Sequence, residues 1–197
     1  MMTCPMIIRV TQFLSLLEAV LLPHQQRNEP VDKKLFEMYF IYCVAWAFAG
    51  LFETDDRQRF FKEILEKIPN APIPQISAAR AANEKETIFD YCVHYETKTW
   101  KMWEVPEWQP PKRLIFSQLL IPTSDSIRAE YIMSRIADLP VEKHKERKEF
   151  GLKNTLLVGG SGTAKTSVAL MFTSRFDSEK MLFKRVNFSS ATQPINF

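Results

Sequence analysis

The feature that most constrains the fold is a glycine-rich segment between a short apolar run and a helical stretch. It reads VGGSGTAKT, spans residues 158–166, and holds three of the five glycines in the 197-residue chain. Residues 154–159 before it predict a strand, residues 165–176 predict a helix, and residues 181–188 predict a second strand. This order predicts a βαβ unit, and therefore a parallel sheet with a right-handed crossover.

The segment has the composition of a phosphate-binding loop. Small residues allow backbone N–H groups to converge on an anion, and the N-terminus of the following helix adds its positive end. A lysine and a hydroxyl, here Lys165 and Thr166, then reach the terminal phosphates and Mg²⁺. The residues of this predicted cofactor site are Gly159, Gly160, Ser161, Gly162, Thr163, Ala164, Lys165 and Thr166, with Thr166 as the metal ligand.

Ala164 stands where the pattern G-x-x-x-x-G-K-[ST] has its last glycine. Alanine is unstrained in the right-handed region of backbone space and costs about 1–2 kcal/mol in the left-handed region. The loop therefore survives if φ at Ala164 is negative, although the extra methyl group can crowd a phosphate. Two other readings stay open: a strand-to-helix turn that binds nothing, and a loop that keeps the fold but binds nucleotide weakly.

No catalytic residue is predicted after the loop. Nucleotide hydrolysis needs a carboxylate on a neighbouring strand that holds Mg²⁺ and orients water. After Thr166 the acidic residues are Asp177 and Glu179, and both belong to a polar turn. We therefore expect no useful turnover by this chain alone.

The remaining sequence predicts helices on both sides of a β-hairpin. Residues 7–22 have apolar side chains at helical spacing, and Pro23 is expected to end that helix. Residues 34–52 are apolar nearly all round, which predicts a buried helix, and residues 56–68 predict an amphipathic helix. A further helix is predicted over 126–139.

The hairpin follows a proline-rich connector at 69–74, which cannot be helical. Residues 87–95 and 97–105 are rich in aromatic and β-branched side chains, as expected of two antiparallel strands. This region also contains three tryptophans, which either cover apolar surface between units or stack on a ligand: Trp100, Trp103 and Trp108.

Composition excludes several classes of function. A net charge of +3 is too small to predict a nucleic-acid partner, and the densest charged run, 142–149, mixes both signs. Three cysteines without paired spacing and three widely separated histidines argue against a disulfide framework or a zinc site. The longest uncharged apolar run, 38–52, has 15 residues, fewer than the roughly 20 of a membrane span. We expect neither nucleic acid nor a membrane as a partner, and no secretory signal.

Several segments, taken in order, resemble dynein heavy chains from about residue 34 to residue 197. They are YFIYCVAWAFAGLFETDDRQRFFKEIL, FDYCVHYETKTWKMWE, LLIPTSDSIRAEYIMSRI, TLLVGGSGTAKTSVAL and VNFSSAT. The form VGGSGTAKT is more similar to axonemal than to cytoplasmic dynein. The resemblance implies an α/β P-loop (AAA+) partial domain at the C-terminal side, preceded by an all-helical small subdomain and a β-hairpin.

The resemblance also implies a place in the motor ring. Residues 1–68 correspond to the helical small subdomain that ends the second AAA+ module, and residues 69–112 to the proline-rich connector and hairpin. Residues 113–197 correspond to a truncated large subdomain that starts the third module, whose site is regulatory in that family. The resemblance therefore implies that the chain is a fragment of a larger protein.

By the same resemblance, Ile121 and Pro122 are expected near the adenine of ATP or ADP, Lys165 on the β- and γ-phosphates and Thr166 on Mg²⁺. The implied partners are the neighbouring AAA+ modules of the same chain and, through the parent microtubule motor, intermediate and light chains and microtubules. The implied location is the cytoplasm, the cytoskeleton and the axoneme of the cilium. Two alternatives stay open: a stand-alone small P-loop NTPase or kinase, and a non-enzymatic helical interaction module.

Overall fold

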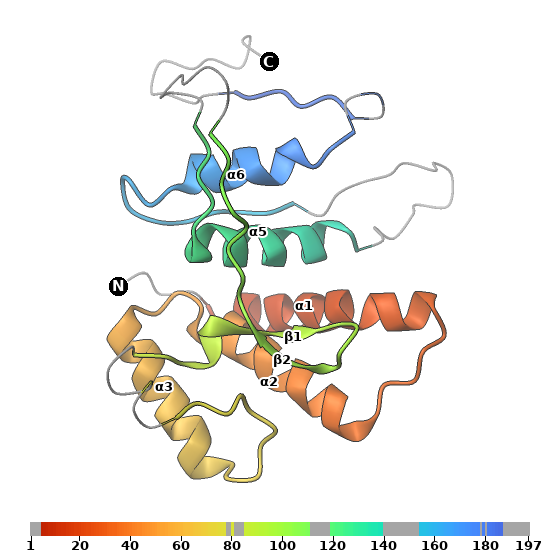
Figure 1. Ribbon diagram of the computed structural model, residues 1–197, viewed down its shortest axis with the longest axis vertical. Coiled ribbons are helices and arrows are strands. Elements are labelled where there is room, and N and C mark those ends of the chain that lie inside the picture. The colour runs from red at the N-terminus through yellow and green to blue at the C-terminus, as the bar shows by residue number, and fades with distance from the viewer. Residues whose placement is uncertain are drawn as a thin grey trace.

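The computed structural model describes residues 5–77, 80, 85–110, 119–139, 154–177, 179 and 181–186. Within these residues the chain forms five α-helices, one short 3-10 helix and a two-stranded antiparallel sheet (Figure 1). The densest charged run, 142–149, and the last two residues of the second predicted strand, 187–188, lie outside the described residues.

Helix α1 spans Met6–Gln26 and includes Pro23 in its last turn, so the prediction that Pro23 ends the helix is wrong. Proline lacks an N–H donor, but its carbonyl group still accepts a hydrogen bond. The N–H of Arg27 donates to the Pro23 carbonyl at 3.2 Å, and the last turn closes around the proline. Among the described helices, α1 is the one long and apolar enough to cross a membrane, a test that core helices and signal sequences also pass.

Helix α2 spans Lys33–Ala49 and is buried along most of its length, which confirms the prediction of a core helix. The carboxylate of Asp32 caps its start by accepting from the N–H of Leu35 at 2.7 Å. The helix ends before Gly50 rather than at residue 52. Its inner side packs against α1 and the hairpin in one apolar core, whose buried members are Leu16, Val20, Leu35, Met38, Tyr39, Tyr42, Cys43 and Val93.

Helix α3 spans Thr54–Lys67 and is amphipathic, as predicted, with Phe61 as its buried residue. Phe61 belongs to a second apolar cluster that also contains Ile88 and Phe89 of the short helix η1, Ile88–Asp90. The amphipathic helix therefore covers the end of α2 and the entry to the hairpin.

The predicted β-hairpin is present but shorter than expected. Strand β1 spans Tyr91–His94 and strand β2 spans Thr99–Met102, and they pair antiparallel with Val93 opposite Trp100. The four residues between them form the turn, in which Lys98 has a φ of 52°. Residues 88–90 of the first predicted strand form η1, residues 95–98 form the turn, and residues 103–105 lie beyond the end of β2.

The tryptophans at the hairpin cover apolar surface. Trp100 donates its indole N–H to the Pro72 carbonyl at 2.6 Å, and Trp103 donates to the Phe89 carbonyl at 3.2 Å. Both rings pack against the first core. Burial with a satisfied indole N–H is the arrangement expected of a structural tryptophan, so the two rings are committed to packing rather than to a ligand.

Helix α5 spans Ser124–Ala137 and starts at a capping box formed by Thr123 and Ser126. It lies between α1 and α6, which spans Lys165–Ser174, as Figure 1 shows. Its inner side chains pack on the first core: Tyr131, Ile132 and Ile136. Helix α5 thus joins the helical unit to the part of the chain that carries the glycine-rich loop.

The predicted βαβ unit does not form among the described residues. Segments 154–160 and 181–186 form neither helix nor strand, and neither pairs with a strand in the part of the chain that the structure describes. Leu156 is 85% exposed and Leu182 is 98% exposed. A strand is stabilised by backbone hydrogen bonds to a neighbouring strand, and without them these apolar runs remain unpaired segments.

Candidate nucleotide site

The glycine-rich loop lies at the surface and leads directly into α6. Residues 158–164 are exposed, Lys165 is half-buried and Thr166 is exposed. Thr166 lies in the first turn of α6, so the structure brings the predicted lysine and hydroxyl residues to the same end of one helix as the glycines.

The start of α6 is left open to an anion. Asp32 and Thr123 cap α2 and α5 with their side chains, whereas the N-cap of α6 provides no side-chain hydrogen bond. Its first turn carries no acidic residue. The first N–H groups of a helix have no partner within the helix, and they carry the positive end of the helix dipole. This helix terminus therefore has the electrostatics that favour a phosphate group.

Ala164 adopts the left-handed conformation, with φ of 56° and ψ of 17°. The condition for an unstrained loop, a negative φ at this position, is therefore not met. An alanine in this region costs about 1–2 kcal/mol, a cost that the glycine of the general pattern avoids. Gly162 is also left-handed, with φ of 75°. The loop keeps its left-handed turn at Ala164 and carries the strain there.

Lys165 contacts the loop itself. Its Nζ donates to the carbonyl oxygens of Gly159 and Gly160 at 2.9 and 2.5 Å and lies 3.2 Å from Thr163 Oγ1. Thr163 Oγ1 in turn donates to the Gly160 carbonyl at 2.9 Å. The ammonium group is thus held at the mouth of the loop, within the set of residues expected to bind phosphate.

Ile121 and Pro122 lie just before α5, away from the loop residues. Ile121 is 53% exposed. Pro122 lines a cavity of about 690 Å³ together with residues of α5 and α6, among them Ile127 and Met171. Of the described residues that line this cavity, none belongs to the loop 159–166. Among the described elements, α6 both begins at the loop and lines this cavity beside Pro122.

Sequence reasoning missed the residues that hold α6 in place. The Arg175 guanidinium, just after α6, pairs with the carboxylate of Asp138 and lies 4.0 Å from that of Glu130. It also stacks on Phe172, with 5.1 Å to the ring centroid. Arg175 and Asp138 are 37 residues apart in the chain, so no local spacing in the sequence predicts the pair.

The acidic residues after the loop form a local turn. The N–H of Glu179 donates to Asp177 Oδ1 at 3.0 Å, as expected of a polar turn. Within the described part of the chain, no group of three or more histidine, cysteine or acidic side chains could hold a metal ion.

Two known protein domains match this chain, one after the other along the sequence. Residues 1–105 match the dynein heavy chain AAA lid domain, and residues 108–197 match the P-loop containing dynein motor region. The chain belongs to the dynein heavy chain family.

Named relatives are axonemal and flagellar. The chain is 31% identical over 186 residues to the dynein gamma chain of the flagellar outer arm of Chlamydomonas reinhardtii, which covers 92% of this chain and 4% of the relative. It is 30% identical over 193 residues to dynein axonemal heavy chain 5 of Mus musculus, which covers 95% of this chain and 4% of the relative. It is 25% identical over 193 residues, with the same coverage, to the dynein-1-alpha heavy chain of the flagellar inner arm I1 complex of C. reinhardtii. The chain thus corresponds to a small part of an axonemal dynein heavy chain, within its motor region.

Proposed function

We propose that the chain contributes a nucleotide site to the motor region of an axonemal dynein heavy chain, an ATP-driven microtubule motor of the cilium. The observation that carries the proposal is the uncapped start of α6, where Lys165 and Thr166 follow the glycine-rich loop. The ligand is ATP or ADP with Mg²⁺. The matched P-loop motor region supports a nucleotide as the ligand class.

The chemistry of the donor set fits this ligand. The free N–H groups at the start of α6 face the phosphates, Lys165 holds the β- and γ-phosphates, and Thr166 donates its hydroxyl oxygen to Mg²⁺. Bound Mg²⁺ supplies charge neutralisation between the phosphate oxygens. The strain at Ala164 is the feature that argues for weak binding.

The adenine is proposed to occupy the cavity beside Pro122. Met171 and Ser174 on α6 line this cavity together with Pro122 and Ile127. Met171 lies six residues after Lys165, which corresponds to about 9 Å along the helix axis. The apolar wall suits a purine ring, since ligand pockets are lined mostly by apolar side chains with a few polar groups.

The domain arrangement is part of the proposal. Residues 1–68 form the helical small subdomain at the end of the second AAA+ module, residues 69–112 the connector and hairpin, and residues 113–197 the start of the third. The order of the two family matches, lid domain before P-loop region, supports this arrangement.

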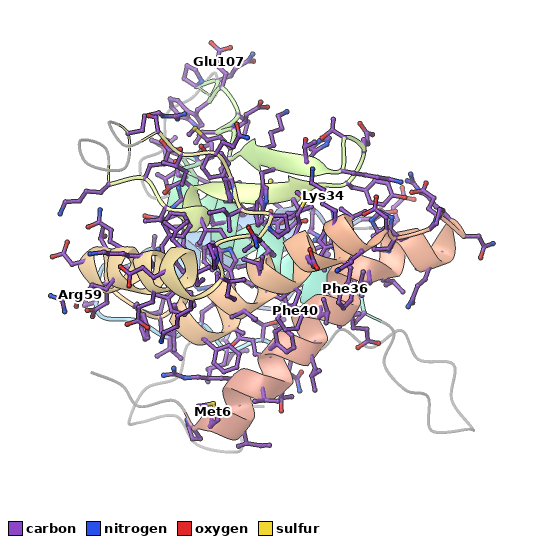
Figure 2. The ribbon with its side chains drawn as sticks, turned by 90° about the horizontal axis from the view of Figure 1, so that it is seen from below. Met6, Lys34, Phe36, Phe40, Arg59 and Glu107 are labelled. Carbon is purple, nitrogen blue, oxygen red and sulfur yellow. The ribbon has the colours of Figure 1, made fainter. Side chains whose placement is uncertain are left out.

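Neighbouring AAA+ modules of the same heavy chain are the proposed direct partners of this piece. An exposed apolar surface on the helical unit supports a protein contact there, since large exposed apolar patches mark interaction sites. Figure 2 shows Met6 near the start of α1, and Phe36 and Phe40 on α2. Met6 is 65% exposed, and Phe36 and Phe40 are 41% and 43% exposed. Intermediate and light chains and microtubules are proposed as partners of the whole motor.

Turnover is not expected from the chain alone. Hydrolysis requires a carboxylate that holds Mg²⁺ and orients the attacking water. In the sequence after Thr166 the acidic side chains are Asp177 and Glu179, and the described turn uses them locally. We propose that this chain binds nucleotide weakly and leaves hydrolysis to residues of the full-length motor.

Calorimetric titration of the full chain with ATP and with ADP, each with Mg²⁺, tests the proposal. We expect weak saturable binding that is lost in Lys165→Ala and reduced by chelation of Mg²⁺. Lys153→Ala is the control, since this lysine precedes the loop and is not assigned to the site. Binding that persists unchanged in Lys165→Ala would contradict the proposed site. Mg²⁺-dependent turnover that Lys165→Ala abolishes would contradict the expectation that the chain alone is inactive.

A further inference from the structure

Lys165, Thr163 and two backbone carbonyls form a closed set of hydrogen bonds in front of α6. The ammonium group donates to the carbonyls of Gly159 and Gly160 and reaches Thr163 Oγ1, which itself donates to Gly160. The ammonium group and the hydroxyl therefore share one acceptor, the carbonyl oxygen of Gly160. Hydrogen bonds from a charged donor are among the stronger ones in proteins, so this set holds the loop in one arrangement.

The contacts also fix the direction in which two peptide groups face. In a trans peptide plane, the C=O and N–H bonds point in opposite directions. Because the carbonyls of Gly159 and Gly160 face Lys165, the N–H groups of Gly160 and Ser161, which share those planes, face away from it. The loop therefore presents oxygen atoms, rather than N–H donors, toward the ammonium group.

A phosphate group requires the opposite orientation, because loops of this kind bind anions with converging backbone N–H groups. Turning the two planes requires large backbone rotations at Gly159 and Gly160, which glycine permits on both sides of φ = 0. Gly159 has no room for a side chain in the observed arrangement, since an added Cβ would lie 2.6 Å from Thr163 Oγ1. Glycine at these positions is therefore compatible both with carbonyls that face Lys165 and with N–H groups that face a phosphate.

We propose that Lys165, Thr163 and the Gly159 and Gly160 carbonyls form an internal latch, and that a nucleoside triphosphate enters only after the latch opens. This inference rests on the proposed function, because it concerns the regulation of the same site. Opening frees the Lys165 ammonium for the phosphates and turns the N–H groups toward them. The latch lowers apparent affinity by the fraction of chains in which it is open.

The rate of acylation of Lys165 tests the latch without nucleotide. The full chain is treated with an amine-reactive ester, and modification is read by mass spectrometry. Lys33, whose side chain is 90% exposed, is the internal reference. Thr163→Val keeps the branched shape and removes the hydroxyl, and we expect it to raise the Lys165 rate about five- to tenfold relative to Lys33. Thr163→Ala is expected to do the same.

Ser167→Ala is the matched control, because it removes another hydroxyl near the start of α6 and leaves the latch contacts in place. We expect the Lys165 rate in this variant to equal that of the wild type. Equal acylation rates in the wild type and in both Thr163 variants would overturn the latch. A rise in the Ser167 variant as large as in the Thr163 variants would overturn it too, because the effect would then not belong to the latch.

Stopped-flow mixing with a fluorescent ATP analogue and Mg²⁺ provides the second measurement. If opening precedes binding, the observed rate levels off at high ligand concentration, and the plateau rises in Thr163→Val. A rate that increases linearly and identically in both proteins overturns the latch. Absence of any binding signal contradicts the proposed function instead, and the acylation rates then still decide whether the latch exists.

Discussion

Arg128 and Asp90 lie 38 residues apart in the chain, yet their side chains meet at 2.6 Å. Asp90 also accepts from the backbone N–H and the hydroxyl of Thr87, which caps η1. The Asp90 carboxylate thus bonds both to Thr87 at the start of η1 and to Arg128 on α5. The two residues come from regions that match different parts of the dynein heavy chain, the lid domain and the P-loop region.

We expect Asp90→Asn to lower the free energy of unfolding by about 2 kcal/mol. The Arg128 side chain is only 13% exposed. When its partner is neutralised, a half-buried charged group loses more interaction free energy than a neutral group does. Asp125→Asn is the control, because Asp125 lies 3.4 Å from the same arginine but its side chain is 88% exposed. Its effect should stay within about 0.5 kcal/mol. Urea unfolding measures both, and equal losses would show that Asp90 has no special role.

Arg57 is expected to be a second strong determinant of stability. Its guanidinium donates to the Gly50 carbonyl at 2.7 Å and stacks over the Phe89 ring, 4.9 Å from the centroid. We expect Arg57→Ala to cost about 2–3 kcal/mol of unfolding free energy, from one charged hydrogen bond and one partly buried cation–π contact. Arg59→Ala, with a side chain that is 81% exposed, should change stability by less than about 0.5 kcal/mol. Similar values for the two arginines in chemical denaturation would refute the role of Arg57.

His24 should make the stability of the helical unit depend on pH. Its Nε2 lies 2.9 Å from the Tyr39 hydroxyl, and burial lowers the pKa of the imidazole. Glu29 raises that pKa and Lys98 lowers it, but burial is the largest influence. Below the ordinary histidine pKa of about 6.5 the unfolded chain therefore binds more protons than the folded chain. Stability is fully present above that pH and is lost as the pH falls.

Urea unfolding between pH 8 and pH 5 measures this dependence. We expect the free energy of unfolding to fall with decreasing pH in the wild type and to fall less in His24→Gln. Tyr39→Phe is the control, because it removes the hydroxyl and keeps the buried imidazole. It should lower stability by about 1 kcal/mol while retaining the pH slope. An unchanged slope in His24→Gln would mean that other groups cause the dependence.

Ala164→Gly should stabilise the start of α6. Glycine removes about 1–2 kcal/mol of left-handed strain, and greater freedom of the unfolded chain offsets up to about 1 kcal/mol of this gain. Ala169→Gly, in the interior of the same helix, should instead destabilise it by about 1 kcal/mol. Hydrogen exchange of the α6 amide groups measures both changes. The same sign in the two variants would show that the φ of Ala164 does not strain the loop.

Sequence periodicity accounts for the helices well and for their ends less well. The buried helix α2 was predictable, because its apolar side chains face all directions. The end of α1 was not, since a proline in a last turn removes one donor without preventing the turn from closing. The strands predicted on either side of the glycine loop need partner strands, and periodicity within one segment does not reveal whether partners exist.

The residues of the candidate site remain a prediction from the sequence pattern, and their geometry could not be predicted from it. The glycines, Lys165 and Thr166 follow a pattern with a chemical reason for each position. The left-handed φ of Ala164 and the contacts of Lys165 with loop carbonyls depend on backbone orientation, which residue types alone leave open. The pair that fixes α6, Arg175 with Asp138, is a long-range contact without a local signature.

The position of α5 has a consequence for where this part of the motor can be divided. The family boundary falls between residues 105 and 108, but α5 lies beyond it and packs on α1. A polypeptide cut at that boundary would leave the apolar side of α1 and of the hairpin open to water. We therefore expect the smallest cooperative folding unit to run from α1 through α5, across the boundary between the two matched regions.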